Sequence, residues 1–204
     1  MHCAPRQDRT DQPRAPRGIG RWAASMWLNL VLLCAALAWA PAARAVETEL
    51  TGFDLVQNEE GVLLSYAVNL ELSRSVEEAL SKAVPLFFVA EADVFRNRFY
   101  WRDARVGSAV RRWRIVYQPL TSTYRVTFDG GLSQNYANRE EALAAISRSA
   151  RWKLAEPGQI EEGSRHYVEF SFRLDTSQLP RPLQIGIGGQ ADWSLSVQRT
   201  QKLQ

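Results

Sequence analysis

Side chains alternate between apolar and polar along several stretches of the chain, and this period of two residues most constrains its fold. Between Gly61 and Ser73 every even position is apolar, whereas Ser65, Asn69 and Glu71 fall on odd positions. Successive residues of a strand point to opposite faces, so this pattern is typical of a strand with one buried face. Strands of this kind indicate antiparallel sheets, because parallel strands are usually buried on both faces.

The same alternation recurs along the chain and predicts a mainly β domain. Turn residues separate paired alternating stretches and predict hairpins over 49–72 and 113–128. Further strands are expected at 86–95, 166–174, 183–187 and 193–197. We therefore expect an antiparallel two-sheet sandwich (immunoglobulin-like) of seven to nine strands, with a partly open barrel as the alternative.

One or two short helices are expected between the strands. A capping box at 75–78, in which the Ser75 hydroxyl accepts a hydrogen bond from the Glu78 amide, predicts a helix that ends before Pro85. A second helix is expected to begin at Asn138. One face of this helix would carry Leu143, Ile146 and Ala150, and Pro157 would lie beyond its end.

Residues 1–45 have the layout of a secretory signal peptide. Five arginines precede an uncharged run from Trp22 to Ala43, and small residues at Ala43 and Ala45 suit cleavage before Val46. The run is long enough to span a bilayer, so an uncleaved membrane anchor is the alternative. Either outcome places residues 46–204 in the periplasm as a single domain, because the arginines hold the amino-terminal end in the cytoplasm.

The expected loss of residues 1–45 changes the charge of the protein. The chain has 25 basic and 22 acidic side chains, but six arginines and two aspartates lie in 1–45, so the formal net charge falls from +3 to −1. A domain near neutrality lacks the basic excess that nucleic acids attract. Both cysteines, Cys3 and Cys34, lie in the same segment, so we expect no disulfide and no thiolate metal site.

Candidate catalytic groups are few. His166 falls in phase with apolar positions of its strand and is expected to be a core residue rather than a base or a metal ligand. Ser108 and Ser164 lack the sequence context of a serine nucleophile. Glu91 and Asp93 share one face of an otherwise apolar strand, and pairing with arginines or exposure to solvent is favoured over a buried catalytic pair. We therefore expect no enzyme, no metal site and no cofactor.

One segment has a composition suited to binding. Between Phe95 and Arg114 seven arginines and several aromatic side chains accompany a single acid, Asp103. On two adjacent strands they would form a positive face for a phosphate, a carboxylate or a protein partner, whereas a solvated strand edge is the alternative. The candidate binding surface comprises Arg96, Arg98, Tyr100, Trp101, Arg102, Arg111, Arg112 and Arg114.

Several stretches together resemble a family of exported proteins. They are VPLFFVAE at 84–91, FYWRD at 99–103, WRIVY at 113–117, YRV at 124–126, LPRPLQI at 179–185 and DW at 192–193. They are similar to the domain of unknown function 4390 family, uncharacterised exported proteins of Gram-negative bacteria with a proline-rich signal peptide. The resemblance implies no catalytic residues. It implies an accessory role towards a membrane sensor kinase, whose genes commonly neighbour those of the family.

These observations predict an exported, non-catalytic binding or adaptor domain. Its expected partner is a membrane protein, such as the periplasmic domain of a sensor kinase, or an anionic component of the envelope. Nucleic acid is not expected as a partner. A small carboxylate-dependent envelope hydrolase, working through Glu91 and Asp93, is the alternative function.

Overall fold

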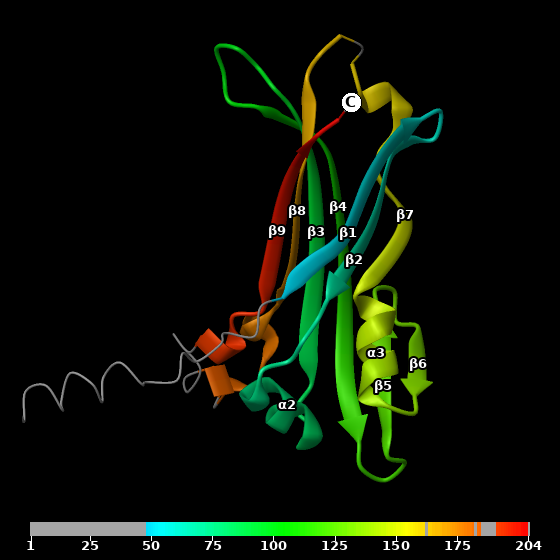
Figure 1. The fold of residues 1–204 in the computed structure, drawn as a ribbon, viewed down its shortest axis with the longest axis vertical. Helices are drawn as coiled ribbons and strands as arrows, with labels where there is room; N and C mark the ends of the chain where they lie inside the picture. The colour runs from blue at the N-terminus through cyan, green and yellow to red at the C-terminus, as the bar shows by residue number, and fades with distance from the viewer. Residues whose placement is uncertain (1–47, 162, 182, 185–190, 204) are drawn as a thin grey trace, which may run out of the picture. The chain divides into compact units, whose positions relative to one another are not determined.

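The computed structural model describes residues 48–203, apart from 162, 182 and 185–190. The predicted signal peptide, 1–45, lies outside the described residues. The described residues form nine strands in two antiparallel sheets, together with two α-helices of eight residues each (Figure 1). The predicted mainly β, two-sheet fold with short inserted helices is therefore confirmed.

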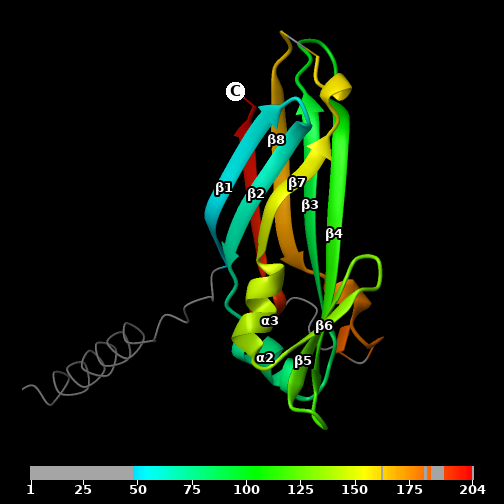
Figure 2. The same ribbon diagram turned by 90° about the vertical axis from the view of Figure 1, so that its right-hand side faces the viewer.

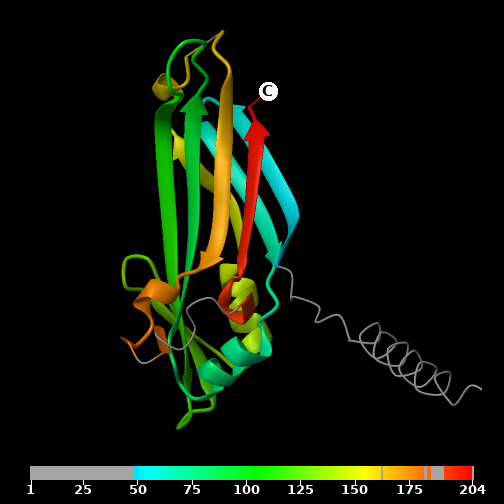
Figure 3. The same ribbon diagram turned by 90° about the vertical axis from the view of Figure 1, so that its left-hand side faces the viewer.

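The two sheets lie face to face, as Figures 2 and 3 show. The smaller sheet has the order β1-β2-β7 and consists of β1 (Glu49–Asn58), β2 (Gly61–Asn69) and β7 (Arg148–Ala155). The larger sheet has the order β6-β5-β4-β3-β8-β9. Its strands are β3 (Leu86–Arg96), β4 (Ala104–Gln118), β5 (Thr123–Phe128), β6 (Ser133–Tyr136), β8 (His166–Leu174) and β9 (Ser196–Lys202).

Aromatic side chains fill the space between the sheets. Phe170 and Phe172 of β8 point inward with almost no exposed surface, and Tyr66 of β2 meets them from the other sheet. The Tyr66 ring centroid lies 4.7 Å from that of Phe170 and 6.5 Å from that of Phe172. Phe88 of β3 stacks on Phe172 at 5.9 Å. Each such ring contributes about 1.5–3 kcal/mol through burial, so this cluster holds the sheets together.

The two predicted hairpins are present. β1 pairs with β2 from Glu49↔Asn69 to Asn58↔Gly61, and β4 pairs with β5 from Trp113↔Phe128 to Gln118↔Thr123. In the first turn the Asn58 side-chain oxygen accepts a hydrogen bond from the Glu60 amide at 2.9 Å. Gly61 then adopts a φ of +111°, a conformation that side chains with a Cβ rarely take.

The first helix begins at a different residue from the one predicted. Ser73, not Ser75, is the N-cap of α2 (Arg74–Ser81), and its hydroxyl accepts a hydrogen bond from the Val76 amide at 3.3 Å. The Ser75 hydroxyl instead donates to Asp192 at 2.9 Å, so the predicted capping box was wrong. The helix ends before Pro85, as expected.

The second helix is shorter than predicted. α3 (Arg139–Ile146) begins at its expected cap, where the Asn138 side chain accepts from the Glu141 amide at 2.8 Å. It does not continue to Ala150, because residues 148–155 form β7 and pair with β2. This strand buries Trp152 and Leu154 against the core, and that burial outweighs the helical spacing of the sequence.

The carboxyl-terminal segment also differs from the prediction. Leu183 and Gln184 were expected in a strand at 183–187, but both amides donate to the Pro180 carbonyl in a helical turn, and 185–187 lie outside the described residues. Trp193 and Leu195 are buried as expected, yet they precede β9 rather than forming part of it. Three 3-10 turns complete the described chain, namely η1 (Pro157–Gln159), η2 (Thr176–Gln178) and η3 (Ala191–Trp193).

At Gly107 the strand β4 passes close to β7, and this contact generates the first prediction. A Cβ placed on Gly107 would lie 2.6 Å from the Leu154 carbonyl oxygen and 2.8 Å from the Ala155 Cβ. Gly107→Ala is therefore expected to lower the free energy of unfolding, measured by urea denaturation, by about 1–3 kcal/mol. The control is Gly158→Ala, where an added Cβ meets no atom within 4 Å and a change within about 0.5 kcal/mol is expected. Equal stability of the two variants would contradict this prediction.

Candidate functional site

The eight residues of the predicted binding surface lie in three different places. Arg111 points between the sheets, whereas Arg112 and Arg114 alternate with the buried Trp113 and therefore lie on the outer face of β4. The other five gather around the loop that joins β3 to β4, namely Arg96, Arg98, Tyr100, Trp101 and Arg102. The structure does not place all of them on one face.

Arg111 connects the two sheets. Its guanidinium donates a hydrogen bond to the Ser149 hydroxyl of β7 at 2.7 Å and lies 5.2 Å from the centre of the Trp152 ring. A guanidinium over an indole face is attracted by the ring quadrupole. Arg111 therefore stabilises the contact between β4 and β7 and does not contribute to the outer surface.

The loop at residues 97–103, which we call the aromatic loop, exposes three consecutive aromatic side chains. Phe99 is 88% exposed, Tyr100 85% and Trp101 80%. The rings of Phe99 and Tyr100 meet edge to face with centroids 4.6 Å apart. Figure 1 shows this loop extending away from the ends of β3 and β4. Three adjacent aromatic side chains that are each exposed by 80% or more are typical of an interaction site.

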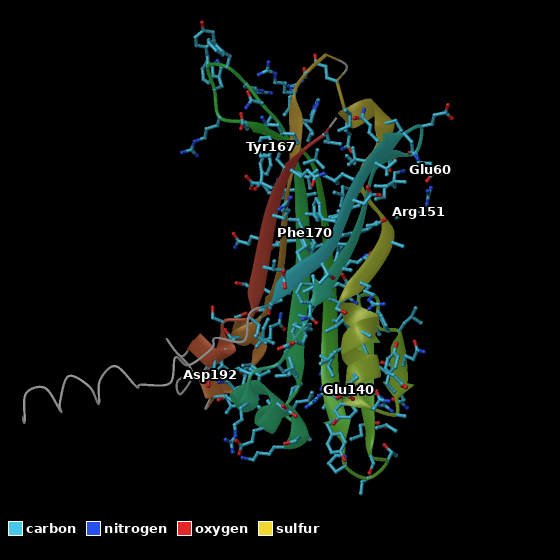
Figure 4. All side chains as sticks on the ribbon, viewed as in Figure 1. Glu60, Glu140, Arg151, Tyr167, Phe170 and Asp192 are labelled. Atoms are coloured by element: carbon cyan, nitrogen blue, oxygen red, sulfur yellow. The ribbon has the colours of Figure 1, made fainter. Side chains whose placement is uncertain are left out.

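Asp103 fixes the base of the aromatic loop. One carboxylate oxygen accepts a hydrogen bond from the Arg98 amide at 3.0 Å, and the other accepts from the Tyr167 hydroxyl at 2.8 Å. Tyr167 of β8, which is labelled in Figure 4, in turn stacks on Phe95 with ring centroids 5.3 Å apart. Burial, together with the hydrogen bond and charge of Asp103, raises the pKa of Tyr167 to about 12. The loop is thus tied to two strands of the larger sheet.

The arginines around the aromatic loop differ in their partners. Arg96 pairs with Glu161, and the Arg105 guanidinium lies 3.6 Å from the Asp93 carboxylate. Arg98 and Arg102 are exposed, and neither forms an ion pair with any residue that the structure describes. Two guanidiniums that directly flank the three aromatic rings are therefore free to meet an anion.

The two carboxylates considered for hydrolysis each face an arginine. Glu91 lies 3.2 Å from Arg173, and Asp93 is the partner of Arg105. Both are partly exposed on the outer face of the larger sheet, the alternative favoured by the sequence.

His166 occupies a buried position at the start of β8. Its Nδ1 lies 3.1 Å from the Ser164 carbonyl oxygen, and its Nε2 has no hydrogen-bond partner among the described residues. This is the core histidine that the sequence pattern predicts. Among residues 48–203 that the structure describes, no three His, Cys, Asp or Glu side chains are grouped as metal ligands.

A cleft of about 410 Å³ lies between α3 and the segment that follows β2. In its lining Arg139 pairs with both Glu77 and Glu140, whereas Glu71 and Arg148 form no ion pair among the described residues. No aromatic side chain lines this cleft, whereas the aromatic loop combines three exposed rings with two guanidiniums that form no ion pair among the described residues. The aromatic loop remains the strongest candidate site.

Comparison with known families identifies the domain. The family model described as Domain of unknown function (DUF4390) matches residues 45–203. The chain belongs to the DUF4390 family. The resemblance of the sequence stretches to this family is thereby confirmed. The family description assigns no activity to the DUF4390 domain. No curated protein and no solved structure matched the chain. No helix within the described part of this DUF4390 protein is long and apolar enough to cross a membrane.

Sequence reasoning placed the aromatic side chains on strands and omitted Phe99 from the candidate surface. A signal for the loop was present in the sequence, because three consecutive aromatic residues cannot all point to one face of a strand. The period of two breaks at 97–103 and resumes in β4. An interruption of this kind between two alternating stretches indicates a connection.

The position of Arg111 generates the second prediction. Arg111→Ala removes a charged hydrogen bond and the contact with Trp152, so we expect the free energy of unfolding to fall by about 1–3 kcal/mol. Arg114→Ala, the matched change at an exposed position of the same strand, is expected to stay within about 0.5 kcal/mol of the wild type. Urea denaturation of both variants measures the difference. An unchanged midpoint for Arg111→Ala would argue against its structural role.

The third prediction concerns the base of the aromatic loop. Asp103→Asn removes a charge that raises the pKa of Tyr167, so this pKa is expected to fall from about 12 but to remain above its ordinary value because burial is the larger cause. A phenol whose pKa is raised by folding contributes stability below its unfolded pKa of about 10, and this is lost as the pH rises through 12.

Ultraviolet titration of phenolate absorbance measures this shift, and Tyr167→Phe identifies the signal that belongs to Tyr167. Between pH 10 and 12 the wild type is expected to lose more stability than Tyr167→Phe. Identical titration curves for the wild type and Asp103→Asn would show that Asp103 does not hold Tyr167.

Proposed function

We propose that residues 46–204 form an exported, non-catalytic binding domain of the bacterial envelope that holds its partner through the aromatic loop. The observation that carries this proposal is the simultaneous exposure of Phe99, Tyr100 and Trp101. Aromatic side chains bury about 150–250 Å² each when they enter a core or an interface. In the free domain these three rings contribute little to stability, so their natural use is in contact with another molecule.

The composition of the loop suits a binding role. Trp, Tyr and Arg are the residues that most often dominate the energy of an interface. Trp101 and Tyr100 stand between Arg98 and Arg102, and the side chains of all four are exposed. The hydrogen bonds to Asp103 hold the loop backbone in the free protein. Because the backbone is already ordered, less conformational entropy is lost when a partner binds.

The proposed partner is a component of the membrane or envelope that the exported domain reaches. Membership of the DUF4390 family supports this, because the sequence resemblance implies an accessory role towards a membrane sensor kinase. The leader at 1–45, whether cleaved or retained as an anchor, would deliver the domain to that compartment. The alternative hydrolase receives no support from the geometry, since Glu91 and Asp93 are each engaged by an arginine.

The fourth prediction tests the aromatic loop in cells. A tagged full chain is crosslinked in the living cell, and the captured molecules are identified by mass spectrometry. The variant Phe99→Ser/Tyr100→Ser/Trp101→Ser is expected to lose most of the captured partner, because the apolar contact area is removed while the core is untouched.

The matched control is Leu120→Ser/Leu132→Ser. These leucines are 102% and 76% exposed. They lie in the turns after β4 and β5, whereas the aromatic loop precedes β4. The control is expected to capture the partner as the wild type does. Equal capture by the wild type and the aromatic-loop variant would contradict the proposed function.

A further inference from the structure

The three rings of the aromatic loop are exposed over most of their surface. Phe99, Tyr100 and Trp101 each expose 80% or more of their surface within a seven-residue connection. Only a small part of any ring is therefore covered by the rest of the protein. A rigid protein face meets such a tip mainly from one side, whereas a fluid bilayer interface surrounds it.

The side chains of the aromatic loop are ordered like the layers of a bilayer interface, with apolar rings in the middle and cationic groups beside them. The three rings form the tip, and Arg98 and Arg102 lie on either side of them without an ion pair among the described residues. Trp and Tyr favour the boundary between lipid headgroups and acyl chains, where an apolar ring and a polar edge are both satisfied. Guanidinium groups bind phosphate through paired hydrogen bonds.

The charge of the whole domain strengthens this arrangement. Residues 46–204 carry a formal net charge of −1, so the domain as a whole has no net attraction to an anionic surface. An anionic surface attracts a basic segment within a Debye length and repels acidic surface elsewhere. Arg112 and Arg114 on the outer face of β4 also form no ion pair among the described residues, but no exposed aromatic side chain accompanies them. Of these two basic segments, only the aromatic loop offers both guanidiniums and exposed rings to a membrane.

We infer that the aromatic loop binds the surface of an anionic phospholipid bilayer, with Phe99, Tyr100 and Trp101 entering between the headgroups and Arg98 and Arg102 contacting lipid phosphates. This inference rests on the proposed function, because it names the partner of the same loop. The anchor formed by Asp103 and Tyr167 holds the loop backbone at the sheet while the rings enter the interface.

Tryptophan quenching tests this inference on the full chain. Vesicles are prepared with phospholipids brominated in their acyl chains, which quench an indole that enters the bilayer. The difference in quenching between the wild type and Trp101→Phe isolates Trp101, since the leader tryptophans are present in both proteins. Vesicles of phosphatidylglycerol with phosphatidylcholine are compared with vesicles of phosphatidylcholine alone.

Trp101 is expected to be quenched in the anionic vesicles and not in the neutral ones. Arg98→Glu/Arg102→Glu is expected to raise the lipid concentration needed for half-maximal quenching at least about 30-fold, which corresponds to about 1 kcal/mol for each arginine near the surface. Arg112→Glu/Arg114→Glu makes the same charge change on the outer face of β4 and is expected to retain quenching.

The outcomes separate this inference from the proposed function. An unquenched Trp101, with protein capture in cells that still depends on the aromatic loop, would show that the partner is a protein and would overturn the inference alone. The loss of both results would overturn both. Equal quenching in neutral and anionic vesicles would refute the role assigned to Arg98 and Arg102 and with it the anionic surface.

Discussion

The contact of Tyr66 with Phe170 and Phe172 is the interaction on which the rest of the structure depends. It joins the smaller sheet to the larger one, and Phe88 and Trp113 extend the same cluster across β3 and β4. A shift of one residue in any of these strands would exchange its inner and outer faces. The cluster therefore fixes the register that places Arg111 between the sheets and its neighbour Arg112 outside.

The aromatic loop inherits its position from this core. β3 pairs with β4 along its whole length, from Leu86↔Ile115 to Arg96↔Ala104, so the strands that carry the loop are held up to its first and last residues. Tyr167, which binds Asp103 at the loop base, lies between the inward-facing His166 and Val168 of β8. The strand β8 therefore packs Phe170 and Phe172 between the sheets with its inner face. With Tyr167, on its outer face, it also holds the aromatic loop.

The sequence predicted the strands whose alternation is complete and failed where two patterns compete. β3 and β8 have one buried face along their length, and both were placed within one or two residues. β7 was missed because Leu143, Ile146 and Ala150 share helical spacing, and only pairing with the distant β2 makes 148–155 a strand. In the candidate site, Arg111 and Arg112 were expected on one positive face, although neighbouring residues of a strand point to opposite faces. The exposure of Phe99 depended on where the strands end.

Stability alone does not account for the composition of the aromatic loop. Exposed apolar side chains add nothing to the core and increase the tendency to aggregate, so a connection selected for folding would favour small polar residues. Asp103 satisfies the turn by accepting from the Arg98 amide, and this hydrogen bond needs none of the three rings. The rings are therefore independent of the local fold, whereas Arg111, Tyr66 and Trp152 contact one another between the two sheets. This separation allows the loop to be optimised for a partner without cost to the sandwich that carries it.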